Sequence, residues 1–287
     1  MHTCTLREAY HQGKQTLSRA GLQSPAFDAL CLFEHAFGIS GRAQLAVHGG
    51  EPADSVKLAF FCELIERRLR EPLQYILGRW EFDGMALRVG EGVLIPREDT
   101  LALVQTACGL LGDGHSSGGK VLDLCAGTGA VGLAMARRLP DVRVICVEKS
   151  PEALPYLRQN IGEFGGGRVS CRTADVLLPP TGVEGGFDCI VSNPPYIPSH
   201  DVDGLAWEVH CEPRMALDGG NDGLLFYRAV CSLWKPLIRA GGWLAFEIGY
   251  DIRDGVMAIM EQNGIDRIGV TKDFNGIDRC VFGTVVS

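Results

Sequence analysis

Residues 121–134 read Val-Leu-Asp-Leu-Cys-Ala-Gly-Thr-Gly-Ala-Val-Gly-Leu-Ala. The apolar start of this stretch is typical of a buried strand, and the part after Gly129 is typical of a helix. A glycine-rich turn between them lets the backbone approach a nucleotide-like ligand at the helix N-terminus. The turn lacks the Lys and Ser/Thr of a phosphate-binding loop. Asp123 before it disfavours a pyrophosphate and suits a cationic ligand.

A second strand is expected over residues 142–148, and it ends in the carboxylate of Glu148. An acidic residue about twenty positions after a glycine turn is the usual partner of ribose hydroxyls. The alternative is a solvated acid in front of a helix that Ser150 caps and Pro151 begins. The spacing favours the ribose role.

Residues 187–192 predict a third buried strand, and the sequence Asn193-Pro194-Pro195-Tyr196 follows it. The two prolines remove two amide donors, so the backbone here presents carbonyl groups. The side-chain oxygen of Asn193 and the carbonyl of Pro194 can then hold both hydrogens of a planar NH2 group, on which Tyr196 can stack. The alternative is that the prolines only end the strand and Tyr196 covers the core.

The chain resembles the HemK/PrmC family of protein glutamine methyltransferases, which modify the Gly-Gly-Gln loop of peptide chain release factors. The resemblance extends over nearly the whole chain and rests on several separate motifs. They are residues 72–78, 93–97, 121–134, 192–197, 212–213, 216–220, 247–249 and 273–279. Two departures stand near the expected site: Glu98 replaces a usual proline, and Leu101 replaces a usual acidic residue. Ile252 also stands where a glutamine is common.

The resemblance implies methyl transfer from S-adenosyl-L-methionine to the N5 nitrogen of a glutamine, with S-adenosyl-L-homocysteine as product. Asp175 and Val176, after a further strand expected over residues 168–174, are implied to line the adenine. The implied cofactor-binding residues are Asp123, Cys125, Ala126, Gly127, Thr128, Gly129, Glu148, Asp175, Val176 and Asn193. The implied catalytic and substrate-binding residues are Asn193, Pro194, Pro195 and Tyr196. We expect no general base with a perturbed pKa, because the proton can leave late to water.

The alternation of strands and helices after residue 120 predicts an α/β fold with a mostly parallel, doubly wound sheet. The resemblance implies a Rossmann-like, seven-stranded class I methyltransferase domain. Three helices are expected before it, and Asp83-Gly84 between apolar runs predicts a β-hairpin. We therefore expect a helical substrate-recognition domain over 1–75, a hairpin linker over 76–96 and a methyltransferase domain over 97–287, with a flexible connection over 112–119. The long segment 198–224 is expected to shape the substrate entrance.

Composition excludes several classes of protein. The 287 residues carry a formal net charge of −8, which argues against nucleic acid as the main partner. No apolar run is long enough to span a membrane, and no signal segment is evident, so we expect a cytoplasmic protein. No exposed repeat or heptad suggests assembly, so we expect a monomer. The eleven cysteines have irregular spacing that is typical of reduced thiols, and the histidines predict no metal site. A catalytic thiol at Cys125 is disfavoured because methyl transfer needs none.

Three alternatives stay open at this point. The acceptor could be a glutamine of a ribosomal protein, or the amino group of a nucleic acid base, since the same Asn-Pro-Pro-Tyr chemistry suits both. The chain could also be a cofactor-binding protein without enzymatic activity. Basic and acidic residues balance in the N-terminal segment, which favours protein recognition there. The basic run at residues 67–70 is expected to be the solvated end of a helix.

Overall fold

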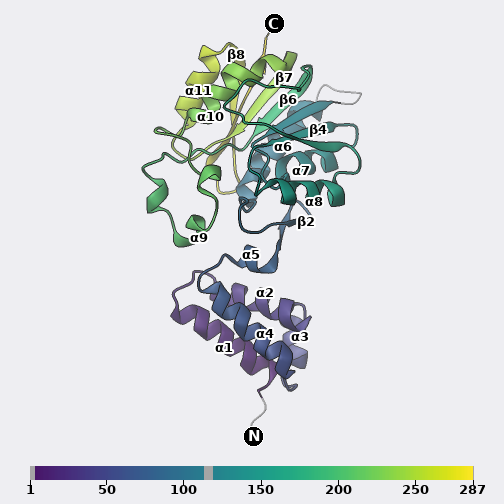
Figure 1. The fold of residues 1–287 in the computed structure, drawn as a ribbon, viewed down its shortest axis with the longest axis vertical. Helices are drawn as coiled ribbons and strands as arrows, with labels where there is room; N and C mark the ends of the chain where they lie inside the picture. The colour runs from purple at the N-terminus through teal and green to yellow at the C-terminus, as the bar shows by residue number, and fades with distance from the viewer. Residues whose placement is uncertain (1–3, 113–118, 287) are drawn as a thin grey trace. The chain divides into compact units, whose positions relative to one another are not determined.

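The computed structural model describes residues 4–112 and 119–286 (Figure 1). The chain divides into two compact units, Met1–Gly78 and Arg79–Ser287, and we describe each by itself. Residues 113–118, the centre of the connection expected to be flexible, lie outside the described ranges.

The first unit is helical. Thr5 and Glu8 form the expected capping box, in which the Thr5 amide donates to Glu8 at 2.8 Å and the Thr5 hydroxyl accepts from the Glu8 amide. Gly38 ends the second helix with a φ of 73°, a left-handed conformation that glycine adopts without strain. The two short helices α3 and α5 were not predicted. The helices are α1 (Leu6–Arg19), α2 (Pro25–Phe37), α3 (Gly41–His48), α4 (Ser55–Arg68) and α5 (Leu73–Leu77).

The core of this unit corrects one prediction about its basic run. Phe33 packs edge-on against Phe61 and stacks on Phe37, with ring centroids 5.6 and 4.5 Å apart. Arg68, which was expected to be solvated, is buried and donates to the buried carboxylate of Asp28 at 2.9 Å. The prediction was wrong because the helical period of α4 turns Arg68 to the same face as Phe61 and Ile65.

The second unit begins with the expected hairpin of β1 (Arg79–Phe82) and β2 (Met85–Arg88). Asp83 and Gly84 both have positive φ, at 51° and 73°, as a two-residue hairpin turn of this kind requires.

A seven-stranded sheet follows, in the order β5-β4-β3-β6-β7-β9-β8. Strands β3 to β7 pair in parallel, and β9 runs antiparallel between β7 and β8, so the predicted fold class is confirmed. The strands are β3 (Lys120–Leu124), β4 (Arg143–Glu148), β5 (Val169–Thr173), β6 (Phe187–Ser192), β7 (Ile238–Glu247), β8 (Ile265–Lys272) and β9 (Asp278–Val285).

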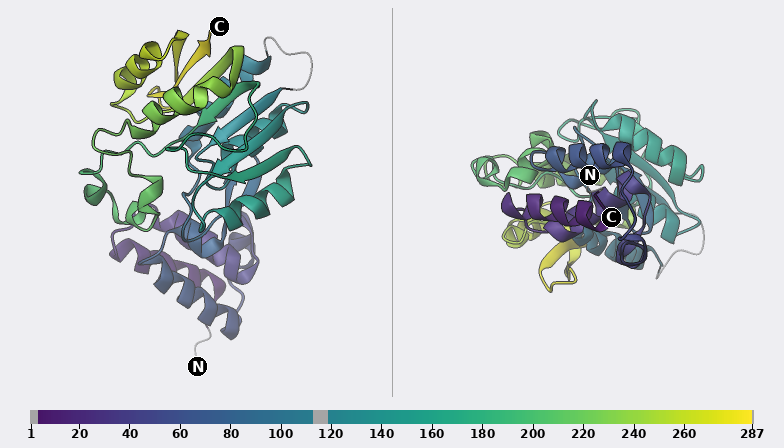
Figure 2. Two further views of the ribbon diagram at one scale, coloured as in Figure 1. Left: turned by 45° about the horizontal axis from the view of Figure 1, so that its top comes forward. Right: turned by 90° about the horizontal axis from the view of Figure 1, so that it is seen from below.

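Helices cover both faces of this sheet (Figures 1 and 2). Successive side chains of a strand point to opposite faces, so Val121 joins one apolar core and Leu122 joins the other. One core includes residues of α6, α7 and α8, and the other includes residues of α10 and α11. These helices are α6 (Leu101–Gly112), α7 (Ala130–Arg138), α8 (Leu154–Phe164), α10 (Leu225–Ala229) and α11 (Arg253–Gln262).

The long segment after β6 holds the short helix α9 (Trp207–His210) and returns to the strand end. The amide of Ile197 donates to the carbonyl of Leu217 at 2.9 Å, and the amide of Gly219 donates back to Ile197 at 2.8 Å. A Cβ on Gly219 would lie 2.7 Å from the Cα of Tyr196. Glycine at 219 therefore allows this segment to pack directly against the end of β6.

Candidate active site

A cavity of about 340 Å³ lies at the carboxyl ends of β3, β4, β5 and β6. Leu124 pairs with Ser192 across β3 and β6, so the next residues, Cys125 and Asn193, leave the sheet side by side. The strand order reverses direction at this pair, and open α/β sheets bind their ligands at such a switch point.

Most of the residues expected in the site line this cavity. Gly129, Pro194 and Tyr196 do not line it, although each is next to a residue that does. The expected residues that line it are Asp123, Cys125, Ala126, Gly127, Thr128, Glu148, Asp175, Val176, Asn193 and Pro195.

Glycine is required in the loop after β3 for conformation and for space. Gly129, before α7, has a φ of 82°, and a Cβ there would lie 2.7 Å from a methyl group of Leu157. A Cβ on Gly132 would lie 2.8 Å from the sulfur of Cys146, so glycine lets α7 approach the sheet closely. Glycine at these two positions therefore allows the loop and α7 to pack closely against α8 and the sheet.

The carboxylate of Glu148 holds the ends of two loops together. One oxygen accepts from the amides of Lys149 and Ser150 at 2.7 Å, and the other accepts from the amide of Gly127 at 2.8 Å. A carboxylate has about four acceptor positions, so Glu148 can still accept a hydrogen bond from a ligand hydroxyl.

Ser150 also accepts from the amide of Ala153 at 3.1 Å, as a capping residue would. The helix α8 begins only at Leu154, so the start predicted at Pro151 is corrected by one turn.

Asp123 is a buried carboxyl group at the floor of the cavity. It accepts from the amide of Gly132 at 2.9 Å, and the thiol of Cys146 lies 3.8 Å away. Burial raises the pKa of Asp123 to about 7, against the opposing effect of these hydrogen bonds. A cation in the cavity would stabilise the ionised form of this group.

Asp175 follows β5 and lies at the other side of the cavity. Burial acts to raise its pKa, but the hydrogen bonds from Lys149 and the Leu177 amide outweigh this, and the pKa is lowered overall. Lys149 lies 2.7 Å from the Asp175 carboxylate and also lines the cavity. Val176, next to Asp175, is buried and adds an apolar surface.

Asn193 is half-buried, and its amide nitrogen donates to the hydroxyl of Thr100 at 3.3 Å. This contact leaves the side-chain oxygen of Asn193 as an acceptor. Tyr196 is packed among apolar side chains, and a Cβ added to Gly249 would lie 3.2 Å from its ring. Burial raises the pKa of the Tyr196 hydroxyl, which is therefore neutral near pH 7.

Sequence reasoning missed some residues that line the cavity, both directly after a strand end and in more distant segments. Thr100 and Lys149 line the cavity but were given no role. Arg97 also lines it, and it forms an ion pair with the buried carboxylate of Glu212, which accepts from the amide of Ile95 at 2.9 Å. The motifs at residues 93–97 and 212–213 were a signal that these positions belong to the site.

The thiol of Cys125 lies in the loop with a φ of 59°. Burial raises the pKa of this thiol, so it is neutral near pH 7 and a poor nucleophile. All eleven cysteines are free thiols. Within residues 4–112 and 119–286, no group of three or more His, Cys, Asp or Glu side chains is arranged to hold a metal ion.

The cavity fits a ligand with hydroxyl groups and a positive charge. Glu148 and Asp175 supply acceptors for hydroxyl or amino groups, Asp123 suits a cation, and the alanines and Val176 supply apolar walls. A seven-stranded sheet with one antiparallel strand and such a cavity at its switch point defines a class I methyltransferase.

Comparisons with known proteins agree with this class. The family described as "Methyltransferase small domain" matches residues 109–226, and "PrmC N-terminal domain" matches residues 8–78. The fold resembles the catalytic domain of hMettl16, with a TM-score of 0.60 and 14% identity over 78% of this chain and 81% of that one.

The relatives are more specific. The release factor glutamine methyltransferase of Geobacter sulfurreducens is 38% identical over 98% of this chain and 97% of its own length. The enzyme of that name from Caulobacter vibrioides is 34% identical over 98% and 96%. The chain therefore belongs to the family of release factor glutamine methyltransferases. Membership in a methyltransferase family implies that it uses S-adenosylmethionine.

Proposed function

We propose that this enzyme transfers a methyl group from S-adenosyl-L-methionine to the N5 nitrogen of the glutamine in the Gly-Gly-Gln motif of peptide chain release factors. The observation that carries the proposal is the placement of Asn193. Its amide nitrogen is bound to Thr100, its oxygen remains an acceptor, and it lines the cavity formed by the glycine loop and Glu148.

Asn193 and Pro194 orient the acceptor amide. An amide nitrogen is a poor nucleophile because its lone pair is delocalised into the carbonyl group. The oxygen of Asn193 and the carbonyl of Pro194 each accept one hydrogen of the glutamine NH2 group, which raises the electron density on its nitrogen and fixes its face. Such orientation lowers a barrier by several kcal/mol without acid–base chemistry. Pro195 and Tyr196 hold the two acceptors in place.

The other site residues bind the cofactor, which supplies an electrophilic methyl group on a sulfonium and leaves as S-adenosyl-L-homocysteine. The N5 nitrogen that gains the methyl group loses one proton, which leaves to water. Glu148 accepts from the ribose hydroxyls, and Asp175 and Val176 contact the adenine. Cys125, Ala126, Gly127, Thr128 and Gly129 bring the loop backbone against the nucleoside. Asp123 stabilises the positive charge of the ligand.

The first unit gives the enzyme a second surface for its protein substrate. Residues 1–75 have balanced charge, which suits a protein better than a polyanion. We assign these residues to substrate recognition, 76–96 to a linking hairpin and 97–287 to methyl transfer. The described part of the chain contains no helix long and apolar enough to cross a bilayer. We propose a monomer that acts in the cytoplasm, where release factors work.

The test is mass spectrometry after incubation with the methyl-labelled cofactor and either purified release factors, ribosomal proteins or nucleic acid. One added methyl group on the Gly-Gly-Gln glutamine, absent with an Asn193→Ala variant that still binds S-adenosyl-L-homocysteine, supports the proposal. Label on a ribosomal protein or in nucleic acid alone would show that the acceptor is wrong. An Asn193→Ala variant with most of the wild-type kcat would show that the residue assignment is wrong.

A further inference from the structure

Glu247, the last residue of β7, is a buried carboxyl group directly behind Asn193. Glu247 is only 2% exposed to solvent, and its Oε2 atom has no hydrogen-bond partner among the described residues. Ser192 pairs with Phe246 across β6 and β7, so Asn193 and Glu247 follow at the same level. Asn193 and Thr100 line the cavity, whereas Glu247 does not.

The contacts of Glu247 determine which way the amide of Asn193 faces. Thr100 and Asn193 are the side-chain donors that face the carboxyl of Glu247 and act to lower its pKa, and the nitrogen of Asn193 donates to the hydroxyl of Thr100. An ionised carboxylate can only accept. An asparagine amide that faces it must therefore present its NH2 group to it, and its oxygen faces the opposite direction. A buried carboxylate thus selects one of the two orientations of the Asn193 side-chain amide that differ by exchange of its oxygen and nitrogen.

Charged neighbours surround this carboxyl from several elements. Burial raises the pKa of Glu247 to about 7, while the hydroxyl of Thr100 and the charge of Arg279 oppose the rise. Asp99 adds a like charge, and Tyr196, Tyr227 and Cys280 are the other titratable groups that face it.

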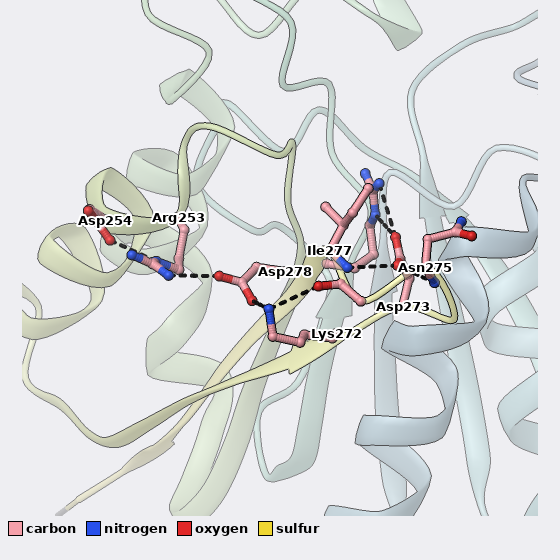
Figure 3. A network of polar contacts seen from close by, with 9 residues as sticks. Arg253, Asp254, Lys272, Asp273, Asn275, Ile277 and Asp278 are labelled. Carbon is pink, nitrogen blue, oxygen red and sulfur yellow. Dashed lines mark hydrogen bonds and ion pairs between the residues drawn. The ribbon is translucent and has the colours of Figure 1, made fainter.

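Arg279, a cation whose charge lowers the pKa of this carboxyl, is held by the hairpin between β8 and β9. It donates to Asp273 at 3.2 Å and to the carbonyl of Ile248 at 3.3 Å. Asp273 also accepts from the amides of Asn275 and Ile277 at 2.9 and 3.0 Å (Figure 3). The hairpin therefore fixes a positive charge beside Glu247.

We propose that Glu247, through Thr100, is a positioning residue that fixes the amide of Asn193 with its oxygen toward the acceptor. This inference rests on the proposed function of Asn193 as a hydrogen-bond acceptor. It explains why an acidic residue stays buried at this position although its burial is unfavourable. With Glu247 ionised, the site selects a substrate with NH2 hydrogens and rejects a carboxylate of the same shape.

The experiment compares Glu247→Met, which has no acceptor oxygen, with Glu247→Gln, which keeps one. We measure kcat for methyl transfer to a release factor at saturating cofactor, the Kd of S-adenosyl-L-homocysteine, and binding of peptides that carry Gly-Gly-Gln or Gly-Gly-Glu. We expect kcat to fall about tenfold or more in the Met variant and less in the Gln variant, because the Met variant has no acceptor facing the donors of Thr100 and Asn193. The Kd of the cofactor product should change by less than about threefold.

Two further measurements distinguish a changed orientation of the Asn193 amide from a general disruption of the site. In the Met variant the side-chain amide of Asn193 is free to rotate by about 180°. The ratio of the Kd of the Gly-Gly-Glu peptide to that of the Gly-Gly-Gln peptide should therefore become smaller. The wild-type kcat should rise with pH through about 7 as Glu247 loses its proton, and the Gln variant should lack this step. Thr100→Val should resemble the Met variant and Thr100→Ser the wild type, with Thr106→Val on α6 as the control.

The outcomes are distinguishable. If the wild type methylates glutamine, Asn193→Ala is inactive and Glu247→Met keeps its kcat and its peptide preference, the inference is wrong and the proposed function stands. If the wild type methylates no glutamine, both are wrong. If the Met variant does not fold, the activities of Thr100→Val and Thr100→Ser provide the test instead. Equal activity of Thr100→Val and the wild type overturns the inference.

Discussion

The carboxylate of Glu148 accepts a hydrogen bond of 2.8 Å from the backbone amide of Gly127 and so ties the end of β4 to the loop after β3. The side chain lines the cavity at the position proposed for the ribose. Glu148→Gln keeps the size of the side chain but replaces one acceptor oxygen by an NH2 group. This donor would face one of the backbone amides that now donate to Glu148, those of Gly127, Lys149 and Ser150. We expect the Kd of S-adenosyl-L-homocysteine, measured by calorimetry, to rise about tenfold or more.

The matched control is Glu163→Gln on α8. Glu163 is a partly exposed acid that pairs with Arg79 at 2.8 Å and has no contact with the cavity. Its replacement should leave the Kd unchanged within about twofold, because exposed ion pairs contribute little. Equal effects of the two variants would mean that the loss of negative charge, and not the contact with the loop, weakens binding.

Cofactor binding should depend on pH through Asp123. Burial raises the pKa of this carboxyl to about 7, so much of the ligand-free protein carries it protonated below that value. A cationic ligand favours the ionised form, so binding below about pH 7 must release a proton. The affinity for S-adenosyl-L-methionine should therefore rise as pH increases toward 7 and level off above it. Calorimetry between about pH 5.5 and 8.5 tests this.

Asp123→Asn removes the titration while its amide oxygen still accepts from Gly132. The ligand's own ionisation affects both proteins equally, so the difference between their pH profiles isolates Asp123. The linked effect on stability has the opposite sign. Between the unfolded pKa of about 3.9 and the folded value of about 7, the folded ligand-free protein binds the extra proton, so its stability falls as pH rises. Parallel profiles of wild type and variant would exclude Asp123 as the titrating group.

Sequence patterns predicted the sheet well because its strands are short apolar runs bounded by turn residues. The strands ending near Glu148 and Ser192 needed no knowledge of tertiary contacts. The helix α5 was not predicted because its five residues, between Pro72 and Gly78, are too few to show a helical period. A basic run likewise carries no sign that one of its members, Arg68, pairs with the distant Asp28.

The strand-end residues of the cavity were predictable because they directly follow recognisable strands. The grouping of Thr100, Asn193 and Glu247 was not, because these residues come from three distant parts of the chain. Their proximity depends on the pairing of β6 with β7 and on where the turn before α6 packs. The raised pKa of Glu247 follows from burial, which no sequence spacing encodes. The expectation of no general base with a perturbed pKa stays a prediction, because Glu247 is proposed to position Asn193 and has no role in proton transfer.

Gly129→Ala should destabilise the enzyme more than Gly166→Ala does. Both glycines have positive φ, 82° and 55°, so each alanine carries a conformational cost of about 1 kcal/mol. Only at Gly129 would the new Cβ meet a neighbour, a methyl group of Leu157 at 2.7 Å, whereas the space at Gly166 is open. The clash should add about 1–3 kcal/mol to the loss in the free energy of unfolding. Urea denaturation measures both, and equal losses would mean that Leu157 moves away freely.

The buried ion pair of Asp28 and Arg68 should contribute far more to the free energy of unfolding than the partly exposed ion pair of Arg67 and Glu71. Both side chains are about 5% exposed, and Arg68 also donates to the carbonyl of Glu71 at 3.0 Å. Asp28→Ala leaves a buried guanidinium without its carboxylate, which costs about 3–5 kcal/mol in such cases. Glu71→Ala removes the partner of Arg67, an ion pair with each side chain about one-third exposed, and should cost at most about 1 kcal/mol.

Urea denaturation followed by circular dichroism should show this difference in the transition of the helical unit. The double variant Asp28→Leu with Arg68→Met removes both charges and should recover much of the loss, because it leaves no charge unpaired. If Asp28→Ala costs no more than Glu71→Ala, water reaches Arg68 in solution and the pair is not a buried one. If the double variant is as unstable as Asp28→Ala, the loss comes from packing rather than from the unpaired charge.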